Sequence, residues 1–153
     1  MICIGIDPGE HTGLAVWDTE TQAFAQLTTV PLHRALLQVL TLKESGETIH
    51  VTFEDARQRQ WLPRERNLSE YRGRLMGAGA AKRDARIWEE FLTDNAIPFT
   101  AVPPRKGATK WSPDTFARVT GYTGRTSNHA RDAALLVFQR TKYVLKGQNM
   151  SII

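Results

Sequence analysis

The stretch "IGIDPGEHTG", residues 4–13, places Asp7 at the end of an apolar, strand-like run, and a Pro-Gly pair that predicts a turn follows directly. An ionised carboxylate in an apolar setting is very costly unless it is paired or coordinates a metal ion. Because the neighbouring sequence supplies no partner for Asp7, we expect the partner to come from a distant part of the chain.

The residues around this stretch predict strands first. Residues 1–7 and 12–18 read as two strands that the "PGEH" turn joins into a hairpin, and residues 23–30 as a third strand. Apolar spacing predicts a helix over residues 31–43, with Pro31 at its start. Residues 48–54 then alternate as a strand. The first third of the chain therefore predicts three strands, a helix and a strand.

The rest of the chain predicts mostly helices. A long amphipathic helix, or a broken pair, runs from about Ser69 to Leu92, where Gly73, Gly77 and Gly79 indicate either close approach of another backbone or a helix that begins after Gly79. The remaining expected elements are a fifth strand over 97–104, a helix over 112–121 and a last helix, capped by Ser127 or Asn128, over 129–141.

The length of 153 residues fits a single domain over 1–153, and we expect residues 142–153 to be a loosely held tail. A content of 41% hydrophobic and 24% charged residues is typical of a globular protein. The sequence has neither a membrane-spanning apolar run nor a signal-peptide pattern, which predicts a cytoplasmic location. The only cysteine, Cys3, is expected to be a packed core thiol.

Positive charge is concentrated in one segment. Residues 57–86 hold nine Lys or Arg against three acidic residues, a balance of +6 in a chain whose net charge is +4. Such a segment favours a polyanionic partner, although a solvated helix face gives the same count.

Two further elements supply candidate partners for Asp7. Glu54 ends the fourth predicted strand, and its carboxylate reaches Asp7 if that strand lies beside the first. The next residue, Asp55, points to the opposite side. His129 and Asp132 stand three positions apart in the first turn of the last helix and share a face.

Three carboxylates close together repel unless cations neutralise them. Oxygen ligands suit Mg²⁺ or Mn²⁺, and two such ions about 3.5–4 Å apart form a clamp for in-line phosphoryl transfer. Each residue also has a structural alternative: Asp7 could cap its turn, Glu54 could pair with Arg57, His129 could cap or pack, and Asp132 could balance the helix dipole. Taken together, the three acidic groups favour a metal-dependent phosphodiesterase.

Three motifs, "GIDPG" on the first strand, a Glu ending the fourth and "HARDAALLVF" on the last helix, resemble the RuvC-type Holliday-junction resolvases of the ribonuclease H-like superfamily. The resemblance implies an α/β fold with a five-stranded mixed sheet and helices on both faces. It implies a structure-selective endonuclease of DNA recombination and repair, with Asp7, Glu54, His129 and Asp132 as catalytic residues that hold two Mg²⁺ or Mn²⁺ ions. His129 stands where many members carry a carboxylate, which could favour Mn²⁺ or let the imidazole orient or deprotonate water.

The resemblance also implies a homodimer, because symmetric cutting of a four-way DNA junction needs two active sites related by a two-fold axis. The helix over residues 69–92 is the candidate interface, and covering the sheet is its alternative use. Trp61 is expected to stack on an unpaired base or to pack in the core. Basic residues expected to contact phosphates are Arg57, Arg59, Arg64, Arg66, Arg72, Arg74, Arg105, Lys106 and Lys110.

Other classes of protein fit less well. Sugar-kinase and actin-like ATPases also place glycines after a first-strand aspartate, but they need two related lobes, and the sequence has no internal repeat. A non-catalytic junction-binding module would be expected to lose an acidic ligand, and all three are present. A ribonuclease H-like nuclease acting on RNA or on other branched DNA is the main alternative, since a fold and a metal site do not specify the substrate.

Overall fold

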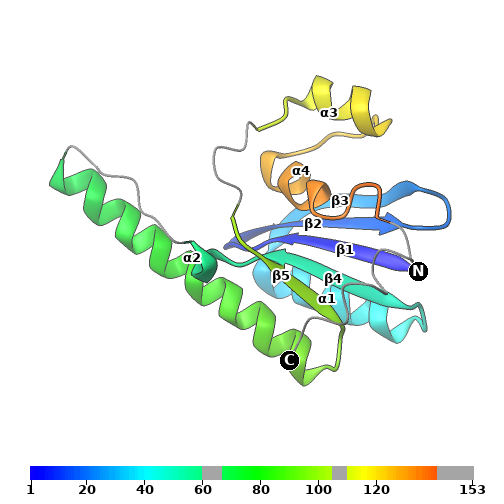
Figure 1. Cartoon of the computed structure of the whole chain (residues 1–153), viewed down its shortest axis with the longest axis horizontal. Coiled ribbons are helices and arrows are strands. Elements are labelled where there is room, and N and C mark those ends of the chain that lie inside the picture. The colour runs from blue at the N-terminus through cyan, green and yellow to red at the C-terminus, as the bar shows by residue number, and fades with distance from the viewer. Residues whose placement is uncertain (60–66, 105–109, 141–153) are drawn as a thin grey trace.

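The structure is a computed structural model, and it describes residues 1–59, 67–104 and 110–140. Within these ranges a single sheet carries helices on both faces (Figure 1). Its strands are β1 (Ile2–Asp7), β2 (His11–Asp18), β3 (Ala23–Pro31), β4 (Ile49–Glu54) and β5 (Phe99–Val102). The helices are α1 (Leu32–Glu44), the short 3-10 helix η1 (Ala56–Gln58), α2 (Leu68–Asp94), α3 (Pro113–Thr120) and α4 (Asn128–Leu135).

The strands lie in the order β3-β2-β1-β4-β5. The first three form an antiparallel meander, whereas β4 pairs parallel with β1 and β5 pairs parallel with β4. The predicted five-stranded mixed sheet with helices on both faces is therefore confirmed. The carboxyl ends of β1, β4 and β5 meet at one edge, which is where open α/β sheets commonly bind ligands.

The predicted hairpin at the start of the chain is also confirmed. Asp7 at the end of β1 lies opposite Gly13 on β2. The Thr12 hydroxyl donates a hydrogen bond to the Gly9 carbonyl oxygen over 2.7 Å and so closes the turn. The turn lies at the same edge as the carboxyl ends of the parallel strands.

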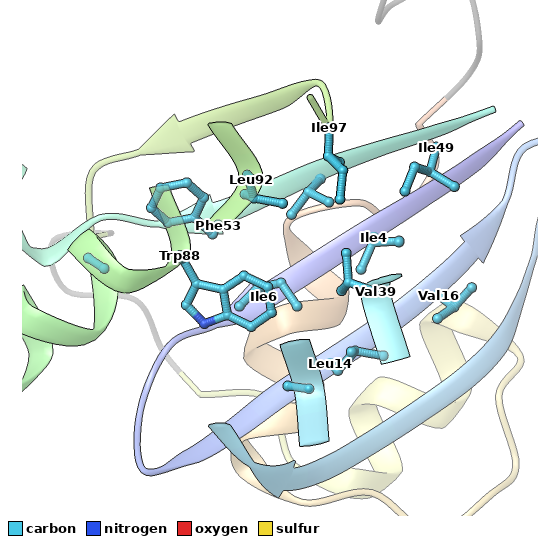
Figure 2. Close-up of a cluster of buried hydrophobic side chains, with 13 residues drawn as sticks. Ile4, Ile6, Leu14, Val16, Val39, Ile49, Phe53, Trp88, Leu92 and Ile97 are labelled. Atoms are coloured by element: carbon cyan, nitrogen blue, oxygen red, sulfur yellow. The ribbon is translucent and has the colours of Figure 1, made fainter. Parts of the chain in front are cut away.

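A first core fills the space between the sheet and helices α1 and α2 (Figure 2). Alternate residues of β1 and β4, such as Ile6 and Phe53, point into it and meet Val39 of α1 and Trp88 of α2. All four side chains are fully buried. Their burial fixes the register of the parallel strands, because a one-residue slip would turn every apolar side chain to the other face.

A second core lies on the opposite face, under α3 and α4. Its aromatic part joins Trp17 of β2 and Phe24 of β3 to Phe116 of α3 and to Phe138. Cys3 is buried in this core as predicted, and burial raises the pKa of its thiol to about 11. At neutral pH the group is therefore an uncharged thiol.

Helix α2 is continuous, so the predicted alternatives of a broken pair or of a helix that begins after Gly79 are wrong. The Asn67 side chain caps its first turn by accepting a hydrogen bond from the Glu70 amide. Added Cβ atoms at Gly73, Gly77 and Gly79 would meet nothing within 4 Å among the described residues. No described backbone approaches these glycines because the first turns of α2 extend past the sheet (Figure 1).

The last helix is shorter than predicted: α4 ends at Leu135, whereas the apolar pattern predicted a helix through Thr141. The amides of Leu136 and Val137 bond to carbonyls three residues back, and Gln139 adopts a positive φ of 60°. The apolar residues after α4 are buried by this turn rather than by a helix. Thr141 and the predicted tail, 142–153, lie outside the described residues.

Candidate active site

The Asp7 carboxylate faces α4 from the end of β1. Alternation along β1 points Ile4 and Ile6 into the first core and Cys3, Gly5 and Asp7 to the other face. The Asp7 side chain is 19% exposed. Burial raises the pKa of this carboxyl above its usual value, and a hydrogen bond to His129 partly opposes the effect. Asp7 is thus a partly buried acid at the edge of the sheet.

The partner of Asp7 is His129, in the first turn of α4. His129 Nδ1 lies 2.8 Å from Asp7 Oδ2. The Ser127 hydroxyl caps α4 by accepting a hydrogen bond from the Ala130 amide, and it also lies 2.5 Å from the Thr29 hydroxyl of β3. Asp7 therefore bonds to a distant histidine instead of capping its own turn.

Two glycines allow α4 to lie directly on the sheet. A Cβ atom at Gly13 would fall 2.0 Å from the His129 carbonyl oxygen, and one at Gly5 would fall 2.1 Å from that of Ala133. No side chain fits in either gap, since real Cβ atoms essentially never approach another heavy atom so closely. The close approach brings the first turn of α4 to the end of β1.

Asp132 lies one turn further along α4 and is bonded to a lysine. Lys110 Nζ lies 3.3 Å from Asp132 Oδ2. The charge of Asp132 also acts to raise the pKa of Asp7, which shows that the two carboxylates share one electrostatic environment. The lysine at this position supplies the compensating positive charge.

Glu54 ends β4 beside Asp7. Ile6 pairs with Phe53 in the parallel register, so Asp7 and Glu54 occupy the next positions of two adjacent strands. Ile49, Val51 and Phe53 point into the first core, which places Glu54 by alternation on the same face as Asp7. Its side chain is half-buried.

The structural alternative for Glu54 was an ion pair with Arg57, but the arginine pairs with Asp55 and Glu89 instead. Arg57 Nε and Nη2 bond to the two oxygens of Asp55 over 2.8 and 2.9 Å, and Nη1 bonds to Glu89 Oε2 over 2.6 Å. Burial alone would raise the pKa of the Asp55 carboxyl, but the Arg57 hydrogen bonds outweigh it and hold that pKa below its usual value. Arg57 thus connects the residue after β4 to α2 through two ion pairs, and these two carboxylates balance its positive charge.

The other residues predicted to contact nucleic acid are distributed unevenly. Arg59, Arg72 and Arg74 are exposed, the latter two on the first turns of α2. Lys110 reaches the Asp132 carboxylate. Five of the predicted residues lie outside the described ranges: Trp61, Arg64, Arg66, Arg105 and Lys106.

The residue types at the candidate site suit a divalent metal ion, but the arrangement of the described residues does not form a metal site. Carboxylate oxygens and an imidazole are suitable ligands for Mg²⁺ or Mn²⁺. Within residues 1–59, 67–104 and 110–140, however, no three His, Cys, Asp or Glu side chains are grouped to hold a metal ion. One oxygen of Asp7 contacts His129 and one oxygen of Asp132 contacts Lys110, so a metal ion would compete with these partners or bind the second oxygen of each carboxylate.

Sequence reasoning missed the residues that set this geometry. Gly5 and Gly13 carry the close approach of α4, and a glycine inside a strand is the signal that could have indicated it. Ser127 was identified as a cap but not as a contact of Thr29. Arg131 on α4 was not singled out at all, although it is buried.

The sheet order, the two helical layers and the position of these acidic strand ends define a ribonuclease H-like α/β fold, as the sequence resemblance implied. The structure is similar to that of RuvC from Thermus thermophilus, with a TM-score of 0.55 and 20% sequence identity over 96% of this chain and 97% of that chain. Comparisons with protein-family models and with curated proteins find no match. At this identity the likeness shows the fold alone.

Proposed function

We propose that the chain is a metal-dependent endonuclease that resolves four-way DNA junctions. The observation that carries this proposal is the contact of Asp7 with His129 at the carboxyl edge of the sheet, with Asp132 one turn away and Glu54 on the adjacent strand. These are the residues that the sequence resemblance assigns to metal binding. The likeness of the fold to RuvC supports a nuclease of this kind.

Asp7, Glu54, His129 and Asp132 would hold one or two divalent ions. A bound Mg²⁺ or Mn²⁺ would stabilise negative charge on the phosphate and lower the pKa of a nearby water molecule. The imidazole in place of a carboxylate removes one negative charge from the site, which favours Mn²⁺ over Mg²⁺.

The side chains of the chain supply the remaining parts of the reaction. Water would attack the phosphorus in line, the bond from phosphorus to the 3′ oxygen would break, and the leaving 3′ oxygen would take up a proton from solvent, which gives a 5′-phosphate and a 3′-hydroxyl. His129 is bonded to Asp7 through Nδ1, and among the described residues its Nε2 makes no hydrogen bond. Nε2 would therefore either ligate a metal ion or accept the proton that the water loses, but not both at once. The Lys110 ammonium group, which pairs with Asp132, can move to an oxygen of the scissile phosphate and stabilise its negative charge there.

Exposed residues elsewhere on the chain support the proposed substrate and assembly. Arg59, Arg72 and Arg74 are exposed and would provide positive charge for the DNA backbone. Arg64, Arg66, Arg105 and Lys106 remain proposed phosphate contacts, and Trp61 remains the residue proposed to stack on an unpaired base. A homodimer would place two sites on one junction, and exposed apolar residues on the first turns of α2 are its proposed contact: Leu68, Tyr71, Leu75 and Met76.

A cytoplasmic location is consistent with this role, and no helix in the described part of the chain is long and apolar enough to cross a membrane.

The proposal is tested by incubating the purified protein with a labelled four-way junction, a linear duplex and an RNA–DNA hybrid, each with Mg²⁺, Mn²⁺ or a chelator. We expect cleavage of the junction with metal, faster with Mn²⁺, and no cleavage with the chelator. Cleavage of the hybrid in preference to the junction would instead identify a nuclease acting on RNA.

Asp7→Asn tests the site itself. It should reduce cleavage by more than about 100-fold, because even residues that only support metal ligands typically contribute 10–100-fold. Junction binding should survive. Asp94→Asn, at the exposed carboxyl end of α2, is the matched control and should cleave normally. Undiminished cleavage by Asp7→Asn would refute the role assigned to Asp7.

A further inference from the structure

Arg131 is a buried cation in the middle of α4. Its side chain is almost completely removed from solvent, and its guanidinium donates to the carbonyl oxygen of Trp111 over 2.9 Å. It also donates to the carbonyl and hydroxyl oxygens of Thr126 over 3.0 and 2.9 Å, and to Asn128 Oδ1 over 2.5 Å. Each of these four acceptors is neutral.

The lack of a carboxylate partner in the described ranges argues against a purely stabilising role. Burying a charge carries a large desolvation cost, and an apolar side chain of similar volume often stabilises a core equally well or better. An arginine is required only if its donors must reach several acceptors at fixed angles, which a lysine cannot do. The geometry of Arg131 meets this condition, since its donors join the segment before α3, the loop before α4 and α4 itself.

One of these connections leads directly to the candidate active site. Trp111 follows Lys110, whose ammonium group lies 3.3 Å from Asp132. Asp132 follows Arg131 on α4. The Arg131 bond to the Trp111 carbonyl therefore links the backbone that carries the lysine to the helix that carries its carboxylate partner.

We propose that Arg131 is a positioning residue that fastens the Trp111 backbone to α4 and thereby holds Lys110 at Asp132. The inference rests on the proposed nuclease function, in which Lys110 acts on an oxygen of the scissile phosphate. Arg131 itself touches neither Asp7 nor Asp132 in the hydrogen bonds of its side chain. It acts through the placement of the lysine.

Cleavage provides the first test, as a double-mutant cycle in single-turnover reactions with saturating enzyme. Arg131→Lys keeps the charge and loses the multiple connections, so we expect a 10–100-fold slower cleavage rate with little change in junction affinity. In a Lys110→Gln background, Arg131→Lys should cause almost no further loss. Equal losses in both backgrounds, or an undiminished rate in Arg131→Lys alone, would overturn the proposal.

Mn²⁺ binding provides a second test that does not depend on catalysis. Because Lys110 competes with a metal ion for Asp132, Lys110→Gln should tighten Mn²⁺ binding measured by titration calorimetry. Arg131→Lys should tighten it in the same direction, and the double variant no further than Lys110→Gln. If Lys110→Gln changes the Mn²⁺ affinity and Arg131→Lys does not, the positioning role is wrong. If the wild-type protein binds Mn²⁺ but cuts no nucleic acid, only the proposed function is wrong.

Two further variants separate positioning from loss of folding. Asn128→Ala removes one neutral acceptor of Arg131 from an exposed side chain, and we expect a smaller loss of cleavage in the same direction. Arg118→Lys changes an exposed arginine on α3 and should leave cleavage and Mn²⁺ binding unchanged. Asn128→Ala leaves the bond to the Trp111 carbonyl in place, so a loss of cleavage as large as that of Arg131→Lys would show that this bond is not what matters, and the proposal would be wrong.

Discussion

Asp7 and His129 are separated by 122 positions in the chain, yet Asp7 Oδ2 and His129 Nδ1 lie 2.8 Å apart. The contact joins the first strand of the sheet to the last described helix. It is possible because glycines at two positions let the helix backbone lie against the strands. A carboxylate that the local sequence leaves without a partner thus obtains one through the tertiary fold.

The Asp7 carboxylate should destabilise the protein when no metal is bound. Its pKa is raised in the folded state, so the native state binds the proton more tightly than the unfolded chain does, and stability is lost as the pH rises through the folded pKa. Asp7→Asn should therefore raise the melting temperature at neutral pH in a chelator. Adding Mn²⁺ should raise the melting temperature of the wild type and not that of the variant. A lower melting temperature for Asp7→Asn in the chelator would contradict this reading.

The close approach of α4 should make Gly13 intolerant of any side chain. In Gly13→Ala, the new methyl group would lie 2.0 Å from the His129 carbonyl oxygen, and we expect a loss of about 1–3 kcal/mol in the free energy of unfolding together with weaker cleavage. Gly77→Ala is the control, because nothing described lies within 4 Å and the change should stabilise α2 by about 0.5–1 kcal/mol. Urea unfolding measures both. Equal stability of the two variants would disprove the tight contact.

The Asp55 carboxylate should stabilise the protein in a pH-dependent way. Its pKa is lowered in the folded state from a usual value of 3.8, so its contribution is complete above that value and is lost as the pH falls through the folded pKa. Asp55→Asn should therefore destabilise the protein at pH 7, and the difference from wild type should shrink in more acidic solution. Urea unfolding of the two proteins at a series of pH values measures it. A difference that stays constant down to the most acidic pH would exclude a stabilising charge on Asp55.

The exposed apolar residues of α2 should govern self-association. Leu75→Arg places a charge among them and should weaken the proposed homodimer by at least about 10-fold, the effect of losing roughly 1.4 kcal/mol of contact. Val119→Arg changes an exposed apolar residue of α3 and should leave association unchanged. Sedimentation equilibrium measures both dissociation constants. If Leu75→Arg dimerises as tightly as the wild type, the contact lies elsewhere.

The strands were predictable because the sequence of each one shows a local pattern of apolar residues. The alternation in β4 and the apolar run of β1 reflect burial on two faces, and Pro-Gly marks the turn between β1 and β2. The end of α4 was not predictable in the same way. Its apolar pattern continues past Leu135, but tertiary packing buries those residues in a turn instead.

The positions of the candidate site residues were predictable from the sequence, but their contacts were not. The strand ends and the helix start placed Asp7, Glu54, His129 and Asp132 at one edge. The contact of Asp7 with His129 depends on the distance of α4 from the sheet, and the glycines at positions 5 and 13 set that distance. Likewise, basic composition predicted Arg57 to face DNA, whereas the fold pairs it with Asp55 and with Glu89 from a helix far along the chain.

The order in which these elements leave the ribosome gives the contact between β1 and α4 a biological meaning. A growing polypeptide that has not yet reached residue 128 contains the aspartate of the first strand but neither His129 nor Asp132. Incomplete translation products and fragments that end before that point therefore lack half of the candidate machinery. Under the proposed function, such fragments would be unable to cut DNA, and activity would begin only once the last described helix has been synthesised.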